Sequence, residues 1–391
     1  MAELKQAEVL IIGGGIVGTS IAWGLASRGT RVCVLDEGDE AFRAARGNFG
    51  LIWVQGKGAQ SPSYATWTRR AALAWPDFAT ALQAETGIDL QYEQRGGFSL
   101  CLTETELNAA RTTMQSIAES LEGAYEYELL EAEATRLALP AAGPAVRGSV
   151  YCPRDGQVSP QRLLRALFAA LAARGATVQS GAAVLTIRAT GGGFLVETAK
   201  GRFSAERIVL AAGLSNRWLA PLVGLEAPVA PQRGQVLITE RVAPFLSHPT
   251  MQVRQTGDGT VQIGDTKEWV GFDDGVTHGS IGAMAARAIA CFPALGYVKV
   301  VRTWGALRVM TPDGLPRYES SAEHPKAFLV ACHSGITLAA NHAGPIADWI
   351  LGGAAPEEIA TFRSSDARVG LPVAPPWLDS FPLDGGRRGW G

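Results

Sequence analysis

The sequence predicts an α/β protein, α+β overall, in which a doubly wound parallel-sheet domain carries a smaller antiparallel-sheet domain. Three observations predict this class. A glycine-rich turn joins an apolar strand to a helix near the N-terminus, later strand-like segments fit the same sheet, and intervening regions alternate apolar and polar residues between turn signals. With 391 residues and 47% hydrophobic composition, the chain is long enough to form two lobes.

The first predicted unit is a strand, a helix and a second strand in succession. Residues 8–12 are apolar, as is typical of a buried parallel strand. Residues 16–27 are predicted to form a helix that Gly29 ends, and residues 31–35 a second strand. We therefore expect one βαβ unit at the start of the chain.

The rest of the chain alternates between helical and strand-like segments. Residues 67–85 are rich in Ala and Leu at helical spacing, and residues 90–102 alternate like strands. Ser159 is a good N-cap and Pro160 suits the first helical position, so a helix is predicted from there to Gly175. Strand-like or β-rich segments are predicted at 177–184, 193–198, 207–211 and 227–303, and a strand, tight loop and helix at 328–352.

Charge and cysteine content exclude several classes of protein. The formal net charge is -2 with both signs interspersed, which disfavours nucleic acid or a polybasic membrane contact and favours a small-molecule partner. The five cysteines are far apart, so neither a disulfide framework nor a metal site is expected. Because the sequence contains no apolar run of about 18 residues and no signal-peptide pattern, we expect a cytoplasmic protein without a membrane span.

The turn after the first strand has the spacing of a dinucleotide-binding site. Gly13, Gly15 and Gly18 match the pattern G-x-G-x-x-G. The first glycine permits a tight turn, the second lets the backbone approach a pyrophosphate, and the third allows close contact of helix and strand. Asp36 ends the second strand, where a carboxylate accepts a hydrogen bond from the adenosine ribose. These features predict a Rossmann-like site; a glycine-rich turn that binds nothing is the alternative.

Seven segments, in order along the chain, carry a family resemblance: the glycine pattern, Asp36, and residues 43–50, 211–213, 231–235, 303–316 and 333–344. Together they resemble the D-amino-acid oxidase superfamily of FAD-dependent oxidoreductases, in the branch of glycine oxidase, sarcosine oxidase and D-amino-acid dehydrogenase. Within it, residues 46–58 are similar to the β (flavin) subunits of opine oxidase and D-hydroxyproline dehydrogenase.

This resemblance implies a two-domain architecture in which an antiparallel substrate sheet caps the flavin ring. The FAD-binding domain is expected to comprise residues 1–89, 148–226 and 301–365. The substrate-binding domain is expected to comprise residues 90–147 and 227–300, followed by a C-terminal tail at 366–391.

The resemblance also assigns residues to FAD. The ADP half is expected to contact Gly13, Gly15, Ile16, Val17, Gly18, Asp36, Glu37 and Val184. Arg46, Gly47 and Asn48 fall where relatives wrap the pyrophosphate and the flavin edge, and Ala212 and Gly213 end a strand of the nucleotide-binding sheet. Gly335, Ile336 and Thr337 fall at a helix N-terminus facing flavin N1 and O2, where the helix dipole stabilises negative charge on the reduced flavin.

Three further residues are candidates for the substrate. Arg308 matches the arginine that binds the substrate carboxylate in the resembling oxidases, and a guanidinium fork suits a carboxylate. A surface or lobe-bridging arginine is the alternative. Arg254 lies on a predicted strand of the substrate sheet, where it would meet a second carboxylate. His333 lies near the expected flavin, either as a base or as a loop histidine satisfied by backbone hydrogen bonds.

Two departures from the resembling sequences bear on the chemistry. Where sarcosine oxidase relatives have a cysteine that links to the flavin, this sequence has Ala306, so non-covalent FAD is expected. The lysine that promotes reaction with oxygen in those relatives falls at Gly271, with Lys267 close by. A dehydrogenase is therefore favoured over an oxidase.

The predicted function is FAD-dependent oxidation of the C–N bond of a small amino-acid-like substrate by hydride transfer to flavin N5, giving an imine that hydrolyses. D-amino acids, D-hydroxyproline and N-substituted amino acids (opines) all stay open as substrates. Two alternatives remain. One is a flavin subunit of a hetero-oligomeric dehydrogenase that needs its partner subunits, and the other is a flavoprotein that oxidises 2-hydroxy acids.

Overall fold

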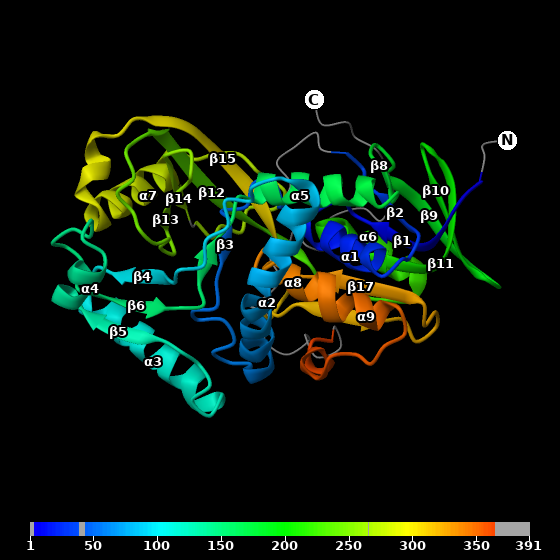
Figure 1. Ribbon diagram of the computed structural model, residues 1–391, viewed down its shortest axis with the longest axis horizontal. Helices are drawn as coiled ribbons and strands as arrows, with labels where there is room; N and C mark the ends of the chain where they lie inside the picture. The colour runs from blue at the N-terminus through cyan, green and yellow to red at the C-terminus, as the bar shows by residue number, and fades with distance from the viewer. Residues whose placement is uncertain (1–3, 39–43, 265, 364–391) are drawn as a thin grey trace.

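The computed structural model describes residues 4–38, 44–264 and 266–363. Arg43 and the predicted C-terminal tail at 366–391 therefore lie outside the described residues. Figure 1 shows the helices and strands in two groups, with the parallel sheet on one side and the antiparallel sheets on the other.

An eight-stranded sheet is the largest in the described part of the chain, with the order β16-β17-β11-β1-β2-β8 and with β10 and β9 continuing from β11. The central strand β1 (Leu4–Ile12) pairs in parallel with β2 (Val32–Leu35) and β11 (Gly201–Leu210). The remaining strands are β8 (Thr177–Gln179), β9 (Val184–Thr190), β10 (Gly193–Thr198), β16 (Arg317–Ser320) and β17 (Ala327–Ala331).

The two faces of this sheet are buried in different cores. Val9 and Ile11 of β1 pack with helices α1 (Ile16–Ser27), α2 (Pro62–Thr86) and α5 (Pro160–Ala173). Leu10 and Ile12 pack in a second core with β9 and β10. Burial on both faces explains why this strand is continuously apolar rather than alternating.

Among the described residues, the antiparallel part contains two larger sheets, a two-stranded pair and helices. One has the order β13-β14-β12-β15 and the other β4-β6-β5, while the short strands β3 and β7 pair with each other. The strands are β3 (Leu51–Ile52), β4 (Gly97–Cys101), β5 (Glu128–Glu131), β6 (Gly148–Cys152), β7 (Gly156–Gln157), β12 (Ala230–Arg241), β13 (Val253–Gln255), β14 (Thr260–Gly264) and β15 (Val300–Met310). The helices are α3 (Glu104–Ser120), α4 (Ala132–Ala138) and α7 (His278–Cys291).

Short helices follow two strands of the parallel sheet. α6 (Asn216–Leu219) follows β11, and α8 (Ala339–Asn341) follows β17. A π-helical segment (His342–Ile346) continues α8 into α9 (Ala347–Ile350). His342 is buried there and its Nε2 lies 3.0 Å from the Tyr318 hydroxyl.

Several predicted elements are confirmed and others are wrong. The βαβ unit is present, and Ser159 caps α5 by accepting a hydrogen bond from the Arg162 amide. The region 227–303 is not β-rich throughout, because α7 lies in it and begins at His278. Its buried residues Met284, Ala288 and Cys291 recur at helical spacing, but Gly and Ala around them weaken the pattern.

The limits of the predicted domains do not follow the sheets everywhere. β6 and β15 fall in segments assigned to the FAD-binding domain, yet they pair with β4 and β5 and with β12, respectively. The proposed division at residues 148 and 301 therefore cuts the antiparallel sheets, and the boundaries stay a prediction.

Candidate functional site

A cavity of about 1260 Å³ lies where both sheet systems meet. The ends of four parallel strands line it through Ile12, Leu35, Ala211 and Val330, and residues of β12 and β15 line it as well. Ligands of open α/β sheets bind at the carboxyl ends of the strands. The volume exceeds the roughly 300–1,000 Å³ of common small-ligand pockets, so it has room for a dinucleotide and a small substrate.

The three glycines of the turn have different surroundings. Gly13 has a φ of +113°, and a Cβ on it would lie 2.4 Å from the carbonyl oxygen of Ala211. A Cβ on Gly18 would lie 2.0 Å from the carbonyl oxygen of Gly13. A Cβ on Gly15 would meet nothing closer than Ala45 Cβ at 3.8 Å. The fold therefore requires glycine at the first and third positions, whereas the second leaves open space beside the cavity.

Asp36 holds the turn from the end of β2. Its Oδ2 accepts a hydrogen bond from the Gly14 amide at 2.7 Å, and its Oδ1 accepts one from the Gly38 amide at 2.9 Å. Each carboxylate oxygen keeps a further lone pair that can accept a ribose hydroxyl. Glu37 and Val184 also line the cavity, together with Ile16 and Val17 of α1.

Two further predicted segments line the same cavity, Arg46 to Asn48 and Ala212 to Gly213. The Asn48 side chain accepts a hydrogen bond from the Gly50 amide at 2.7 Å, and the Gly47 carbonyl accepts one from Trp304 Nε1 at 3.2 Å. The Ala212 amide donates to the Asn216 side chain at 2.9 Å. Side chains thus fix the backbone of both segments.

The loop from His333 to Thr337 is fastened to two distant segments. A Cβ on Gly335 would lie 3.1 Å from a methyl of Val17, so the loop packs on the first turn of α1. The Lys57 ammonium donates to Ser334 Oγ at 2.9 Å and to Thr337 Oγ1 at 3.1 Å. Gly335, Ile336 and Thr337 line the cavity, and the chain becomes helical two residues later, at α8.

Arg308 belongs to β15, and its side chain extends over the neighbouring strand β12 and lines the cavity. Its Nη1 donates to the Thr266 carbonyl at 2.7 Å and lies 3.4 Å from the Arg233 carbonyl. A Cβ on Gly234 would lie 2.5 Å from both terminal nitrogens of Arg308. The guanidinium therefore lies flat on the backbone at Gly234, a position that only glycine permits.

His333 lines the cavity as a neutral imidazole. Burial, together with the positive charges of Lys57, Arg308 and Lys267, lowers the pKa of His333 to about 3. The ring can donate or accept a hydrogen bond, but at neutral pH it carries no charge.

Two predicted residues do not line the cavity. Gly18 lies behind the turn, against Gly13. Arg254 is 3% exposed, donates to Gln262 Oε1 at 2.9 Å and lies 5.8 Å from the ring centroid of Phe49. Burial lowers the pKa of Arg254 to about 9. Its contacts are those of a buried arginine that supports the wall through Phe49, which does line the cavity.

Sequence reasoning missed Lys57 and the acid beside it. Burial lowers the pKa of Lys57 to about 8, while the nearby Asp155 carboxylate opposes that shift. Asp155 is 0% exposed and accepts from the Val54 amide and Gln55 Nε2, both at 2.6 Å; burial raises its pKa to about 7. A lysine between two glycines in an otherwise apolar stretch was the available signal.

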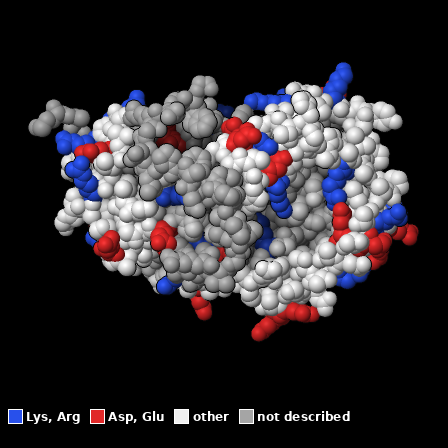
Figure 2. All heavy atoms as spheres, turned by 180° about the vertical axis from the view of Figure 1, so that it is seen from behind, with Lys and Arg blue, Asp and Glu red and all other residues white. Residues whose placement is uncertain are grey.

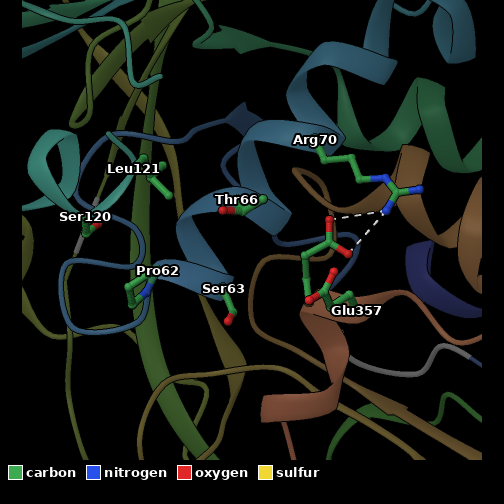
Figure 3. Close-up of a pocket in the computed structure, with 8 residues that line it drawn as sticks. Pro62, Ser63, Thr66, Arg70, Ser120, Leu121 and Glu357 are labelled. Atoms are coloured by element: carbon green, nitrogen blue, oxygen red, sulfur yellow. Dashed lines mark hydrogen bonds and ion pairs between the residues drawn. The ribbon is translucent and has the colours of Figure 1, made fainter. Parts of the chain in front are cut away.

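A second groove, of about 520 Å³, lies on the outside of α2 (Figure 3). Arg70 reaches across it to Glu358 at 3.3 Å, and none of the residues predicted for a site lines it. Charges of both signs are scattered over the face in Figure 2, without a large patch of one sign. The first cavity is therefore the candidate site.

The residues of the cavity fit FAD. The open space at Gly15, the carboxylate of Asp36 and the amides of the turn suit a pyrophosphate and a ribose. The same cavity extends from Asp36 to Arg308, and its volume has room for a ring system and a substrate besides the ADP half. Fold and site together define a dinucleotide-binding flavoprotein.

Comparison with known proteins agrees with this class. The family model described as FAD dependent oxidoreductase matches residues 8–349. A subunit of opine oxidase from Agrobacterium tumefaciens (strain Ach5) is 44% identical over 362 residues, covering 92% of this chain and 98% of that protein. Glycine oxidase of Geobacillus kaustophilus (strain HTA426) is 30% identical over 342 residues, covering 85% of this chain and 89% of that protein.

Among solved structures, glycine oxidase from Geobacillus kaustophilus superposes with a TM-score of 0.85 at 27% identity, covering 92% of this chain and 98% of that one. The chain belongs to the DAO family of FAD-dependent oxidoreductases, and its cofactor is FAD. Within residues 4–38, 44–264 and 266–363, no group of three or more His, Cys, Asp or Glu side chains forms a metal site. No helix in these ranges is long and apolar enough to cross a membrane.

Proposed function

We propose that this chain oxidises the C–N bond of a small amino-acid-like substrate that carries a carboxylate. The observation that supports this most is the position of Arg308, whose guanidinium lines the same cavity as the FAD cradle. A guanidinium binds a carboxylate with two parallel hydrogen bonds and so fixes its orientation as well as its position. The names of the relatives, opine oxidase and glycine oxidase, agree with an amine substrate.

FAD, when bound, supplies the acceptor for a hydride at its N5. The residues of this chain orient the substrate and shield it from water. Arg308 holds the carboxylate, with one nitrogen already fixed by the Thr266 carbonyl. His333, neutral and half-buried, offers hydrogen bonding without adding charge. The substrate becomes an imine, which water hydrolyses, and no protein base is required.

The experiment is anaerobic mixing of the FAD-loaded protein with D-amino acids, D-proline derivatives, N-substituted amino acids and 2-hydroxy acids in turn. Loss of the visible flavin absorbance with an amine supports the proposal. Bleaching by hydroxy acids alone would contradict it and favour 2-hydroxy-acid oxidation. On readmission of air, slow recovery of the absorbance is expected, as for a dehydrogenase, whereas fast recovery would indicate an oxidase.

A second candidate is that the chain is the flavin subunit of a hetero-oligomeric dehydrogenase. Its 44% identity to a protein that is named as one subunit of an enzyme favours this role. In that case the flavin of the isolated chain is reduced slowly or not at all by the amine, and co-expression with candidate partner subunits restores turnover. Full turnover by the isolated chain with an artificial electron acceptor would argue against a required partner.

A further inference from the structure

The Arg308 guanidinium reaches across the strand β12 to the segment on its other side. Arg308 belongs to β15, its side chain passes over Gly234 of β12, and its Nη1 donates to the Thr266 carbonyl at 2.7 Å. Thr266 comes after β14, which pairs with the edge of β12 away from β15. The Gln235 amide of β12 donates to Thr266 Oγ1 at 2.8 Å. The position of the guanidinium therefore depends on how the segment after β14 is attached to β12.

Glu268 attaches this segment to β12 through both its backbone and its side chain. Its backbone forms an antiparallel bridge with Arg233, with N···O distances of 2.9 and 3.0 Å. Its carboxylate accepts from Arg233 Nε and from Gln235 Nε2, both at 2.7 Å. The Ser280 hydroxyl of α7 is a third donor to the same carboxylate. Hydrogen bonds to a charged acceptor are about twice as strong as neutral ones, so residues 266–268 are firmly held.

The Glu268 carboxylate acts from outside the cavity. Arg308 and Gly234 line the cavity, whereas Glu268 and Arg233 do not. Arg233 and Gly234 are neighbours on β12, and successive residues of a strand point to opposite faces. Glu268 can therefore affect a ligand in the cavity only through its charge or through the groups that it holds in place.

We propose that Glu268 is a positioning residue for carboxylate binding: it fastens residues 266–268 to β12 and so keeps the Thr266 carbonyl where it orients the Arg308 guanidinium. The inference rests on the proposed function, because it takes Arg308 as the group that binds the substrate carboxylate. Charge and position predict opposite results when Glu268 is neutralised. Loss of a nearby negative charge favours an anion in the cavity, whereas a displaced guanidinium loses its two parallel hydrogen bonds to a carboxylate.

The test measures how tightly the FAD-loaded protein binds isobutyrate and isobutyramide, from the change that each causes in the visible flavin spectrum. Isobutyrate has the shape of alanine with a methyl group in place of the amine, so it offers no C–N bond to oxidise. Isobutyramide has the same shape without the charge. In wild type, isobutyrate should bind at least about thirtyfold more tightly than the amide. Glu268→Gln should reduce this ratio about tenfold by weakening isobutyrate alone. An unchanged or larger ratio would overturn the inference.

A double-mutant cycle tests whether the effect passes through Arg308. In Arg308→Met the two compounds should bind about equally, because the carboxylate has lost its partner. Adding Glu268→Gln to this variant should then change the ratio by less than about twofold. A change of about tenfold that persists without Arg308 would contradict the positioning role.

Two controls separate this effect from a general loss of structure. Glu106→Gln breaks a similar pair away from the cavity, in which Arg287 donates to the carboxylate at 2.9 and 3.0 Å. Asp273→Asn removes the other acidic partner of Arg233, at 2.6 Å, without touching Glu268. Because the Asp273 side chain is 60% exposed, this pair contributes little, and both controls should keep the ratio within about twofold of wild type. A tenfold loss in Glu106→Gln would contradict the assignment to Glu268.

A milder variant serves if Glu268→Gln folds poorly, which thermal unfolding and FAD affinity report. Ser280→Ala removes a single hydrogen bond from the Glu268 carboxylate and keeps its charge. It should lower the ratio about threefold, in the same direction as Glu268→Gln. In that case an unchanged ratio in Ser280→Ala refutes the inference.

Failure of this inference differs from failure of the proposed function. If wild type binds isobutyrate no more tightly than isobutyramide, Arg308 does not bind the carboxylate and the proposed function loses its main support. If wild type shows the preference and the variants of Glu268 and Ser280 keep it, the positioning role is refuted while Arg308 keeps its role.

Discussion

The two ends of the cavity are built in different ways. At the ADP end, one stretch of chain, from Gly13 to Gly38, provides the turn, the first turn of α1 and Asp36, and most of its polar groups are backbone amides. At the substrate end, the functional groups are side chains from segments far apart in the chain, Lys57, Arg308 and His333. A backbone-built site can be recognised in a short sequence pattern, whereas a side-chain-built site requires the fold.

The largest effect that would separate the two ends is expected for Arg308→Met. Removing one partner of a buried charged pair costs about 2–5 kcal/mol, so kcat/KM should fall by about thirtyfold or more. FAD affinity, measured by fluorescence titration, should stay within about threefold, because the ADP end is untouched. Arg308→Lys keeps the charge without the fork and should recover part of the loss. Equal loss of FAD binding and activity would break the distinction between the ends.

At the other end, Gly15→Ala should weaken FAD binding at least about tenfold without destabilising the apoprotein. The protein leaves room for this Cβ, with Ala45 Cβ at 3.8 Å, so only the pyrophosphate is obstructed. Thermal unfolding of the apoprotein and titration with FAD measure the two quantities. Gly13→Ala is the contrast, because its Cβ would meet the Ala211 carbonyl at 2.4 Å and the apoprotein itself should be destabilised. Unchanged FAD affinity in Gly15→Ala would contradict a close approach of the pyrophosphate to the backbone at Gly15.

Gly234→Ala tests whether backbone geometry also matters at the substrate end. The new Cβ would lie 2.5 Å from the Arg308 nitrogens, so the flexible guanidinium must move off the cavity wall. We expect KM for the substrate to rise about tenfold with little change in FAD affinity. Gly282→Ala in α7 meets nothing within 4 Å and serves as the control. An unaltered KM would mean that the position of Arg308 above Gly234 is not the productive one.

The smallest effect is expected for His333→Asn. Because burial and three neighbouring cations lower the pKa of His333 to about 3, the imidazole is neutral above that pH and becomes charged only below it. The pH profile of kcat/KM should therefore show no limb from His333 between about pH 5 and 8, and the variant should lose less than about tenfold. A loss of a hundredfold or more, with an acidic limb removed from the profile, would make His333 a catalytic base.

The sequence was enough to predict the residues of the ADP end, but only some of those at the substrate end. The glycine spacing and Asp36 sit in one βαβ unit, so local pattern was enough to predict their neighbourhood. Arg308 and His333 were candidates only through family resemblance, and Arg254 was assigned to the substrate from its strand although it points to Gln262 and Phe49. Lys57 was missed because its significance depends on Ser334 and Thr337, more than 270 residues away in the chain.

The fold shows the same limit. Strand β1 and helix α5 were both predicted, because neighbouring residues suffice to define them: an apolar run for the strand, and a cap with an apolar repeat for the helix. Helix α7 was not predicted, because its Gly and Ala residues weaken the apolar periodicity. Its three buried residues can be recognised as core residues only once they are seen to pack against β12 and β14. The pairing of β15 with β12, which brings Arg308 onto Gly234, joins strands separated by about 70 residues and has no local signal.

The most direct test is a crystal structure of the FAD-loaded protein with a non-reactive carboxylate analogue of the substrate. The account predicts the pyrophosphate against Gly13 to Gly15, the flavin ring between the 333–337 loop and Arg308, and the analogue's carboxylate on the Arg308 guanidinium. A carboxylate bound elsewhere in the cavity, with Arg308 still contacting only protein groups, would contradict it.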